Sequence, residues 1–364
     1  MSTRFAQTAF ALILLAPCVC AARDLRIGVF GLFHPQRLAI SSLPTQPAMV
    51  TVGSHRYILS DGRGVSLYRE GSQVRIRIND ESLLAAEVNV ADQWGGGTDF
   101  LLSIPGKITR RFRGRLAVRC EINELVAVVE MGLEAAVASA VAAESAPGAP
   151  LEALKAQAVA TRSYYLASPL RHRHFDFCDT THCQFLREAP SPDSLAAQAT
   201  EATHGMALRY DGAIIPALFT GSCGGRTRTL AEVGLAPGPY PYFSVPCNFC
   251  LHHAPHWSAR LDREQAAGLA SHFEGDRLKL GRILGWDAVP GNNYELHGDG
   301  DVVMVDGSGQ GHGVGLCQLG AAGMARQGHG FQAILTHFFP NTILGMPGNS
   351  RFTQPGSQSR ARTF

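Results

Sequence analysis

Residues 133–166 read LEAAVASAVAAESAPGAPLEALKAQAVATRSYYL and divide into two alanine-rich segments on either side of the turn 147–150. Apolar side chains recur every four positions in the first segment, at Leu133, Val137 and Val141. That spacing is typical of one buried face of a helix. The prolines of the turn end this helix, and a second helix can begin directly after a proline. The stretch therefore predicts a helical hairpin whose second helix runs to about Leu166.

Upstream of the hairpin, from Asp24 to about Ile122, apolar and polar residues alternate in short stretches. The clearest are residues 25–30, 55–59, 73–78 and 114–119. Alternation at period two is typical of half-buried antiparallel strands. We therefore predict an α+β protein: a β-rich N-terminal region at 23–122, a mixed α/β domain with the helical hairpin at 123–345, and a disordered tail at 346–364.

The composition is that of an ordinary globular protein, since 45% of the 364 residues are hydrophobic and 17% are charged. These values exclude wholesale disorder, collagen-like repetition and a coiled coil. The net charge of +2 gives no excess of positive charge of the kind that nucleic-acid-binding proteins carry. We therefore expect no nucleic-acid partner.

Residues 1–22 have the pattern of a secretory signal peptide. Arg4 precedes an apolar stretch from Phe10 to Ala16, and the small residues Ala21 and Ala22 follow. A lipoprotein signal at Cys18 fits less well because a proline directly precedes that cysteine. No later stretch reaches the roughly 18 apolar residues of a membrane span. We therefore expect an exported protein, in the periplasm or cell envelope, with no transmembrane segment in the mature chain.

Two groups of cysteines and histidines have the spacing of metal ligands. His174, Cys178, His182 and Cys183 lie within ten positions, which is compact enough for one loop to close a tetrahedral zinc site. A Cys178–Cys183 disulfide with surface histidines is the open alternative, since export permits disulfides.

Cys247 and Cys250 form a C-x-x-C motif that histidines follow. The pair has three open interpretations: a second metal site, further ligands for the first site, or a strained disulfide. Seven cysteines remain after the signal segment, because Cys18 and Cys20 of the nine fall within it, so at least one has no disulfide partner in the chain.

Glu144 is a candidate general acid. It follows Val141 by three positions and Ala140 by four, so its side chain lies on the apolar stripe near the helix end. Burial and the negative end of the helix dipole both disfavour the carboxylate anion, which keeps the group protonated near neutral pH. Glycosidic cleavage needs such a proton for the leaving oxygen. The alternative is a side chain that bends out to water beside Pro147.

The glycine-rich segment 311–318 contains His312 and leads into a predicted helix. Glycines on both sides leave this histidine with little cover, which favours a position facing a cleft. Cys223 acts as a nucleophile in a competing hypothesis, that of a cysteine amidase, if His312 lies beside it. A free buried or disulfide-bonded Cys223 is the alternative.

Five segments together resemble the SpoIID/LytB family over roughly residues 100–340. They are 141–144, 151–164, 178–184, 223–227 and 311–315. The resemblance implies a bacterial cell-wall lytic transglycosylase of the kind used in sporulation. Such an enzyme cuts the glycan strands of peptidoglycan, especially strands without stem peptides, and leaves 1,6-anhydro ends.

The resemblance also implies roles for individual residues. The glutamate ahead of the Glu-Ala-Leu-Lys-Ala-Gln-Ala-Val-Ala stretch is the family's catalytic acid, which is Glu144 here. Zinc held by Cys178, His182 and Cys183, with His174 as the fourth ligand, is expected to be structural. Apart from what the resemblance implies, we expect four further residues to line the cleft and orient sugar: Arg162, Tyr164, His312 and Gln318.

Two departures from the family pattern leave the substrate preference open. The Glu-Met-Pro sequence of the family is replaced by residues 144–147, Glu-Ser-Ala-Pro, and the Cys247/Cys250 pair is not part of the pattern. The family also includes amidase enhancers. The alternative function is therefore a non-catalytic glycan-binding protein that stimulates a cell-wall amidase.

Overall fold

The computed structural model describes residues 24–168, 171–270, 272–298 and 301–346. The predicted signal peptide at 1–22 lies outside the described residues. So does all of the predicted tail except Met346. None of the described helices is long and apolar enough to cross a membrane.

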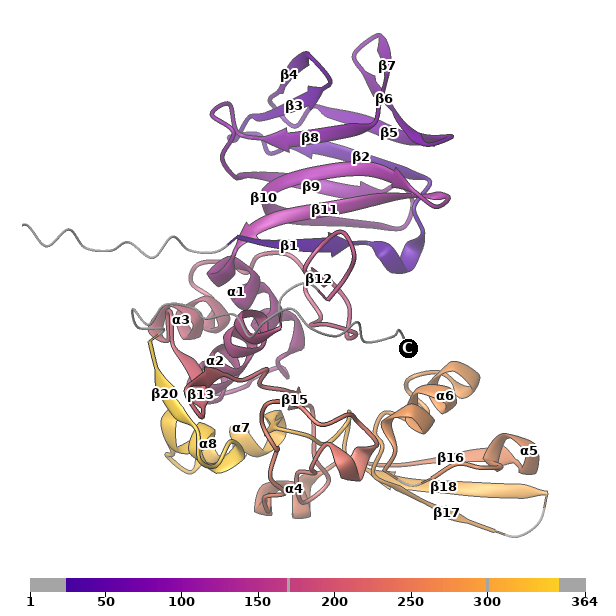
Figure 1. The fold of residues 1–364 in the computed structure, drawn as a ribbon, viewed down its shortest axis with the longest axis vertical. Coiled ribbons are helices and arrows are strands. Elements are labelled where there is room, and N and C mark those ends of the chain that lie inside the picture. The colour runs from indigo at the N-terminus through magenta and orange to yellow at the C-terminus, as the bar shows by residue number, and fades with distance from the viewer. Residues whose placement is uncertain (1–23, 169–170, 271, 299–300, 347–364) are drawn as a thin grey trace, which may run out of the picture.

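The N-terminal part of the chain forms a strongly curled, mostly antiparallel sheet of twelve strands (Figure 1). Its central order is β12-β1-β11-β10-β9-β2-β5-β6-β7, with β8 pairing β10 and β3 linking β8 to β4. The strands are β1 (Asp24–Val29), β2 (Arg37–Ser42), β3 (Ala48–Val52), β4 (His55–Leu59), β5 (Gly64–Glu70), β6 (Gln73–Ile78), β7 (Glu81–Ala85), β8 (Glu87–Ala91), β9 (Thr98–Ile104), β10 (Ile108–Glu121), β11 (Glu124–Gly132) and β12 (Phe177–Cys178).

The alternation seen in the sequence sets the inner and outer faces of this sheet. The apolar residues of β6, for example, are buried, and the arginines between them are more exposed. The four stretches predicted as strands lie in β1, β4, β6 and β10. The α+β class is therefore confirmed. The predicted domain boundary at residues 122–123 falls in the turn between β10 and β11, and the domain division itself stays a prediction.

The predicted helical hairpin is present as α1 (Leu133–Glu144) and α2 (Leu151–Ala167). Strand β11 leads directly into α1, and α3 (Leu195–Ala202) packs against both helices. Helix α2 is buried almost all round, because one side of it joins the core of the sheet and the other joins a second core. That second core includes β13 (Ala207–Tyr210), α7 (Gln318–Arg326) and α8 (Phe331–Phe338).

The remaining elements complete the second core and add an outlying unit. Strands β14 (Ala213–Ile214) and β20 (Ile343–Gly345) pair with β13, and β15 (Phe219–Thr220) pairs with β19 (Leu316–Cys317). Helix α4 (Asn248–His253) and β19 contact α7. The outlying unit has its own small core and contains β16 (His256–Asp262), α5 (Arg263–Ala266), α6 (Glu274–Leu284), β17 (Tyr294–His297) and β18 (Val302–Ser308). Figure 1 shows this unit extending to one side, away from the N-terminal sheet.

An ion pair between a buried arginine and a half-buried glutamate joins the two helices of the hairpin. Arg162 of α2 is fully buried, and it donates to both carboxylate oxygens of Glu134 in α1, at 2.7 and 2.6 Å. The same guanidinium donates to the carbonyl oxygens of Thr200 and Met206 at 3.3 and 3.0 Å. Two-pronged contacts of this kind are among the strongest hydrogen bonds in proteins. One arginine therefore joins α1 and α2 to the chain around α3.

We predict that Glu134→Ala lowers the free energy of unfolding by about 3 kcal/mol, because it leaves the Arg162 charge buried without its counter-charge. Denaturant unfolding of the purified chain measures the loss. The matched control is Glu130→Ala, which breaks an ion pair with Arg115 whose side chains are 36% and 44% exposed. We expect that change to cost less than about 1 kcal/mol. Equal losses in the two variants would contradict the assigned role of Arg162.

Candidate functional site

Glu144 is the last residue of α1, and its side chain lies on the buried side of the helix. Ala140 and Val141, one turn earlier, are completely buried. The carboxyl group is half-buried, and its Oε1 accepts a hydrogen bond from the N–H of Phe185 at 2.8 Å. Burial raises the pKa of Glu144 from its ordinary 4.5 to about 7, while the Phe185 hydrogen bond opposes the rise by favouring the anion. The side chain does not extend freely into water.

Two further contacts fix the end of α1. The side chain of Gln318, at the start of α7, donates through Nε2 to the carbonyl oxygen of Glu144 at 3.1 Å. The hydroxyl of Ser145 lies 2.9 Å from Oε1 of Gln157 in α2. Contacts from α2, α7 and the loop that carries Phe185 therefore converge on the candidate acid.

A cavity of about 160 Å³ lies beside this convergence. Its lining includes Pro147, Gln157, Gln318 and Arg326. Gln157 is 3% exposed, and its Nε2 has no hydrogen-bond partner among the described residues. A volume of this size is smaller than a pocket that encloses a whole small molecule. The cavity is therefore a small and mostly apolar recess, and it is connected to Glu144 through Gln318, which lines it and hydrogen-bonds to the Glu144 carbonyl.

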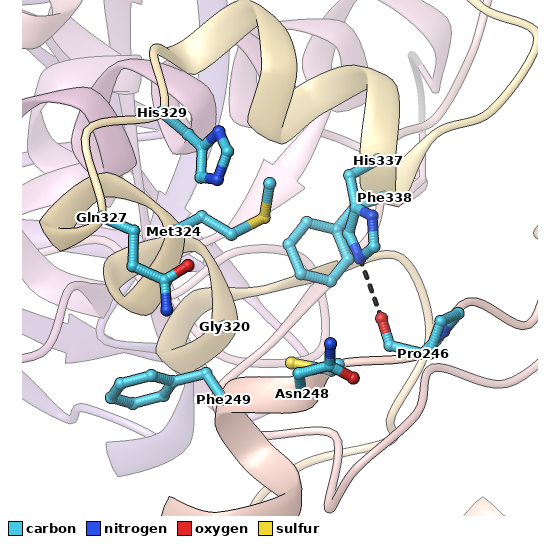
Figure 2. Close-up of a pocket in the computed structure, with 10 residues that line it drawn as sticks. Pro246, Asn248, Phe249, Gly320, Met324, Gln327, His329, His337 and Phe338 are labelled. Atoms are coloured by element: carbon cyan, nitrogen blue, oxygen red, sulfur yellow. Dashed lines mark hydrogen bonds between the residues drawn. The ribbon is translucent and has the colours of Figure 1, made fainter.

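A cavity of about 200 Å³ lies between α4, α7 and α8 (Figure 2). His329, His337 and Phe338 contribute to its lining, and Nε2 of His337 lies 2.9 Å from the carbonyl oxygen of Pro246. Within the described part of the chain, no carboxylate lines this cavity. Among the described residues, none that lines this cavity hydrogen-bonds to Glu144, whereas Gln318 of the smaller cavity does.

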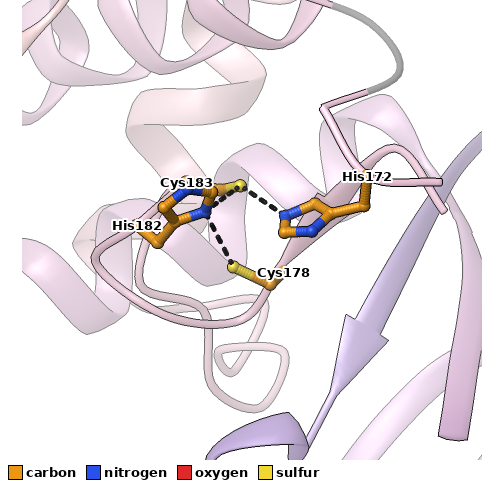
Figure 3. Close-up of side chains that lie close together, drawn as sticks. All are labelled: His172, Cys178, His182 and Cys183. Atoms are coloured by element: carbon orange, nitrogen blue, oxygen red, sulfur yellow. Dashed lines mark hydrogen bonds between the residues drawn. The ribbon is translucent and has the colours of Figure 1, made fainter. Parts of the chain in front are cut away.

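Four side chains of the Cys/His loop (residues 171–186) point toward one another (Figure 3). The ligand atoms of His172, Cys178, His182 and Cys183 all lie within 4.8 Å of one another. Nδ1 of His182 is 3.7 Å from Sγ of Cys178 and 3.5 Å from Sγ of Cys183. A tetrahedral zinc ion separates a sulfur ligand from a nitrogen ligand by about 3.6 Å. The four groups therefore have the spacing of a zinc site.

The histidine that completes this group is His172, whereas the sequence analysis predicted His174. Nε2 of His172 lies 3.2 Å from Sγ of Cys183, while Nε2 of His174 lies 3.7 Å from the carboxylate of Glu121. The two histidines are two positions apart, and residue spacing alone does not distinguish them. The geometry depends on a turn, closed by the hydrogen bond from the Arg171 N–H to the Asp176 carbonyl at 3.0 Å.

The Cys/His loop is anchored to the N-terminal strand through two buried aspartates. The carboxylate of Asp176 accepts the N–H of Arg26 at 3.0 Å. The carboxylate of Asp179 accepts the N–H of Phe30 at 3.1 Å and pairs with Arg110 at 3.0 Å. Strand β12 of the loop also runs parallel to β1. The loop that contacts Glu144 therefore rests on the sheet.

Two predicted cleft residues belong to the core. Arg162 is fully buried in its ion pair with Glu134, and Tyr164 is 2% exposed. The Tyr164 ring packs against Phe177, and its hydroxyl accepts a hydrogen bond from Arg171. Burial leaves neither side chain a surface on which a sugar can lie. Of the four predicted cleft residues, Gln318 is the one that contacts Glu144, and it does so through the backbone carbonyl.

The surroundings of His312 and Cys223 do not fit the cysteine-amidase hypothesis. His312 is half-buried, its Nδ1 accepts the N–H of Val314 at 3.0 Å, and burial lowers its pKa. Cys223 is 1% exposed and lies in a cluster of four cysteines. The Cys223 sulfur is therefore closed to a substrate.

The segment that contains Glu144 matches a known protein family. Residues 121–210 match the SpoIID family, described as stage II sporulation protein. The chain is also 27% identical over 248 residues to an uncharacterized protein of Brachyspira hyodysenteriae, an alignment that covers 60% of this chain and 67% of that protein. The SpoIID resemblance predicted from the motifs is confirmed at residues 121–210, and the predicted segments 223–227 and 311–315 lie outside the matched range. The matched segment contains the helical hairpin and the Cys/His loop.

We predict that the raised pKa of Glu144 makes stability depend on pH. Between about pH 4.5 and 7 the folded state holds this proton and the unfolded state releases it, so the free energy of unfolding decreases as the pH rises. The Glu144→Gln variant lacks the pH dependence that Glu144 contributes. The contributions of all other titrating groups are the same in the two proteins, so they cancel when the free energies of unfolding are subtracted. Denaturant unfolding at several pH values measures the difference. A difference that is constant across this range would refute the pKa of about 7.

Proposed function

We propose, from the SpoIID domain at residues 121–210, that this protein is a peptidoglycan lytic transglycosylase with Glu144 as its single acid and base. The family match relates the chain to sporulation and cell-wall proteins. The observation that supports the specific reaction is a half-buried carboxyl with a pKa of about 7, close to a small recess that Gln318 lines. A group with that pKa is populated in both protonation states at neutral pH, as a residue that first gives and then takes a proton must be.

The reaction has two proton transfers. Protonated Glu144 gives its proton to the glycosidic oxygen as the bond to the anomeric carbon breaks. The resulting carboxylate then accepts the proton of the sugar's own 6-hydroxyl, whose oxygen bonds to the anomeric carbon. The product is a 1,6-anhydro sugar, no water is consumed, and Glu144 ends the cycle protonated.

One carboxyl is sufficient for this chemistry because the nucleophile belongs to the substrate. Hydrolytic glycosidases use a second carboxylate as nucleophile or base. The single carboxyl that the proposal requires is Glu144, whose pKa burial raises to about 7.

The surrounding groups have positioning roles in this proposal. The Phe185 N–H fixes one carboxylate oxygen, which leaves the other free to face the substrate. The side chain of Gln318 fixes the backbone at Glu144 from the side of α7, and the Ser145–Gln157 contact fixes it from the side of α2. The substrate is a glycan strand of peptidoglycan, including strands without stem peptides, which places the protein in the periplasm or cell envelope.

Zinc in the Cys/His loop has a structural role in this proposal. His172, Cys178, His182 and Cys183 would hold it with all four positions filled, which is typical of structural zinc. Bound there, the ion cross-links the loop. Because Phe185 follows Cys183 by two residues, a rigid loop fixes the N–H that hydrogen-bonds to Glu144.

We predict that Glu144→Gln reduces the release of anhydro-ended products from purified sacculi at least about 100-fold, because the amide cannot supply the proton. Mass spectrometry of the soluble products measures the release, from intact sacculi and from sacculi whose stem peptides an amidase has removed. The matched control is Glu201→Gln, an exposed residue of α3, which should keep full activity. If the wild-type protein releases nothing but accelerates an added amidase, the enhancer function replaces the enzyme.

We predict that His172→Ala removes one zinc ion per chain and that His174→Ala removes none, because only His172 lies within the ligand group. Inductively coupled plasma mass spectrometry of the purified chains gives the zinc content. The two variants make the same chemical change two positions apart, so each is the control of the other. Loss of zinc in His174→Ala alone would overturn the assignment.

A further inference from the structure

Four cysteines from separate segments meet inside the second core. Cys223 follows β15, Cys247 directly precedes α4, Cys250 lies in α4, and Cys317 ends β19. Their sulfur atoms all lie within 4.8 Å of one another, and none of the four forms a disulfide. Each residue is at most 4% exposed. This four-cysteine cluster is separate from the Cys/His loop and shares no residue with it.

We infer that the four-cysteine cluster is a second metal site, in which four thiolates bind a single structural zinc ion. A zinc–sulfur bond of about 2.3 Å places the sulfurs of a tetrahedral site about 3.8 Å apart. The sulfurs of Cys250 and Cys317 are 3.3 Å apart, far longer than a disulfide bond of about 2.05 Å. In a 4Fe–4S cluster each cysteine binds a different iron, and in a 2Fe–2S cluster the four cysteines are divided between two irons; both arrangements spread the sulfurs further. The spacing therefore fits one ion.

The backbone around the cluster is arranged to accept thiolates. The N–H groups of Cys223 and Gly320 point at Sγ of Cys317, at 3.4 and 3.3 Å, and the hydroxyl of Ser222 lies 3.5 Å from Sγ of Cys250. Such contacts orient metal ligands and stabilise their negative charge. Hydrogen-bond donors lie close to two of the four buried sulfurs. Such donors are expected around thiolate ligands and are not required where cysteines only pack as apolar side chains.

Gly320 shows how closely the chain approaches these sulfurs. A Cβ atom at this position of α7 would lie 2.4 Å from Sγ of Cys247 and 3.4 Å from Sγ of Cys317. Any side chain there displaces a sulfur. The glycine is therefore required for the first turn of α7 to pack on the cluster.

The ion has a structural role because four thiolates fill its coordination and water has no access. It joins α4 and the β15–β19 pair to the start of α7. Cys317 directly precedes Gln318, whose side chain contacts the carbonyl of Glu144. Cys223 and Cys317 are also 94 positions apart, and the outlying unit lies between them in the chain. The ion therefore fixes both one wall of the recess and the base of that unit.

The test is the zinc content of the full mature chain, purified through an export pathway without reductant. We expect two ions per chain in the wild type, one in Cys250→Ser and one in His172→Ala. Cys120→Ser is the matched control, since Cys120 hydrogen-bonds to the Gln73 carbonyl outside both groups, and it should keep two ions. In the His172→Ala chain only the four-cysteine cluster should bind cobalt, and the bound cobalt should show strong sulfur-to-metal charge-transfer absorption. The double variant His172→Ala/Cys250→Ser should lose this absorption.

A second variant covers the case in which Cys250→Ser does not fold. Gly320→Ala keeps all four thiols but crowds Sγ of Cys247, and we expect it to release one zinc ion to a chelator at least about tenfold faster than the wild type. Two disulfides among the four cysteines, found by mass spectrometry of the alkylated chain, would overturn the inference. So would iron at the site, or two zinc ions retained in Cys250→Ser. These outcomes do not depend on glycan cleavage, which the Glu144→Gln assay tests separately.

Discussion

The burial of α2 on almost every side constrains the arrangement of the whole molecule. Leu154 and Ala158 of this helix belong to the core of the sheet, and Val159 and Ala160 belong to the core around α7 and α8. Small side chains allow neighbouring elements to approach closely on both sides. Arg162 is the long charged side chain that is buried in α2. Its burial is tolerated because the guanidinium donates hydrogen bonds to a carboxylate and to two carbonyl oxygens. The position of α1, and with it the position of Glu144, follows from this packing.

The candidate acid is supported by parts of the chain that fold against different cores. The Cys/His loop supplies the Phe185 N–H from the side of the sheet, and α7 supplies Gln318 from the side of the second core. Each support leads directly to a cluster of potential metal ligands. The carboxyl is thus held between two segments that each carry potential metal ligands, and rigid support of this kind is what the proposed catalytic role requires.

The sequence predicts those features that depend on short-range periodicity. The helical hairpin and the placement of Glu144 on its apolar stripe follow from a four-residue spacing, and the strands follow from alternation. The burial of Arg162 cannot be predicted from this periodicity. Its partner Glu134 lies 28 positions earlier, and the sequence does not show whether an arginine in a helix faces solvent or a carboxylate. The choice of His172 over His174 depends on one turn. The four-cysteine cluster is only half visible as a C-x-x-C motif, since its other two sulfurs arrive through the parallel pairing of β15 and β19.

The parallel pairing of β1 with β12 has a consequence for the order of folding. The contacts that anchor the Cys/His loop, such as that between Arg26 and Asp176, join residues 150 positions apart. Closing so long a separation carries an entropic cost that local helices do not have, and contacts of this kind slow folding. One edge of β1 therefore stays unpaired until the Cys/His loop folds against it. We expect the support of Glu144 to form late, after the sheet and the hairpin have each taken shape.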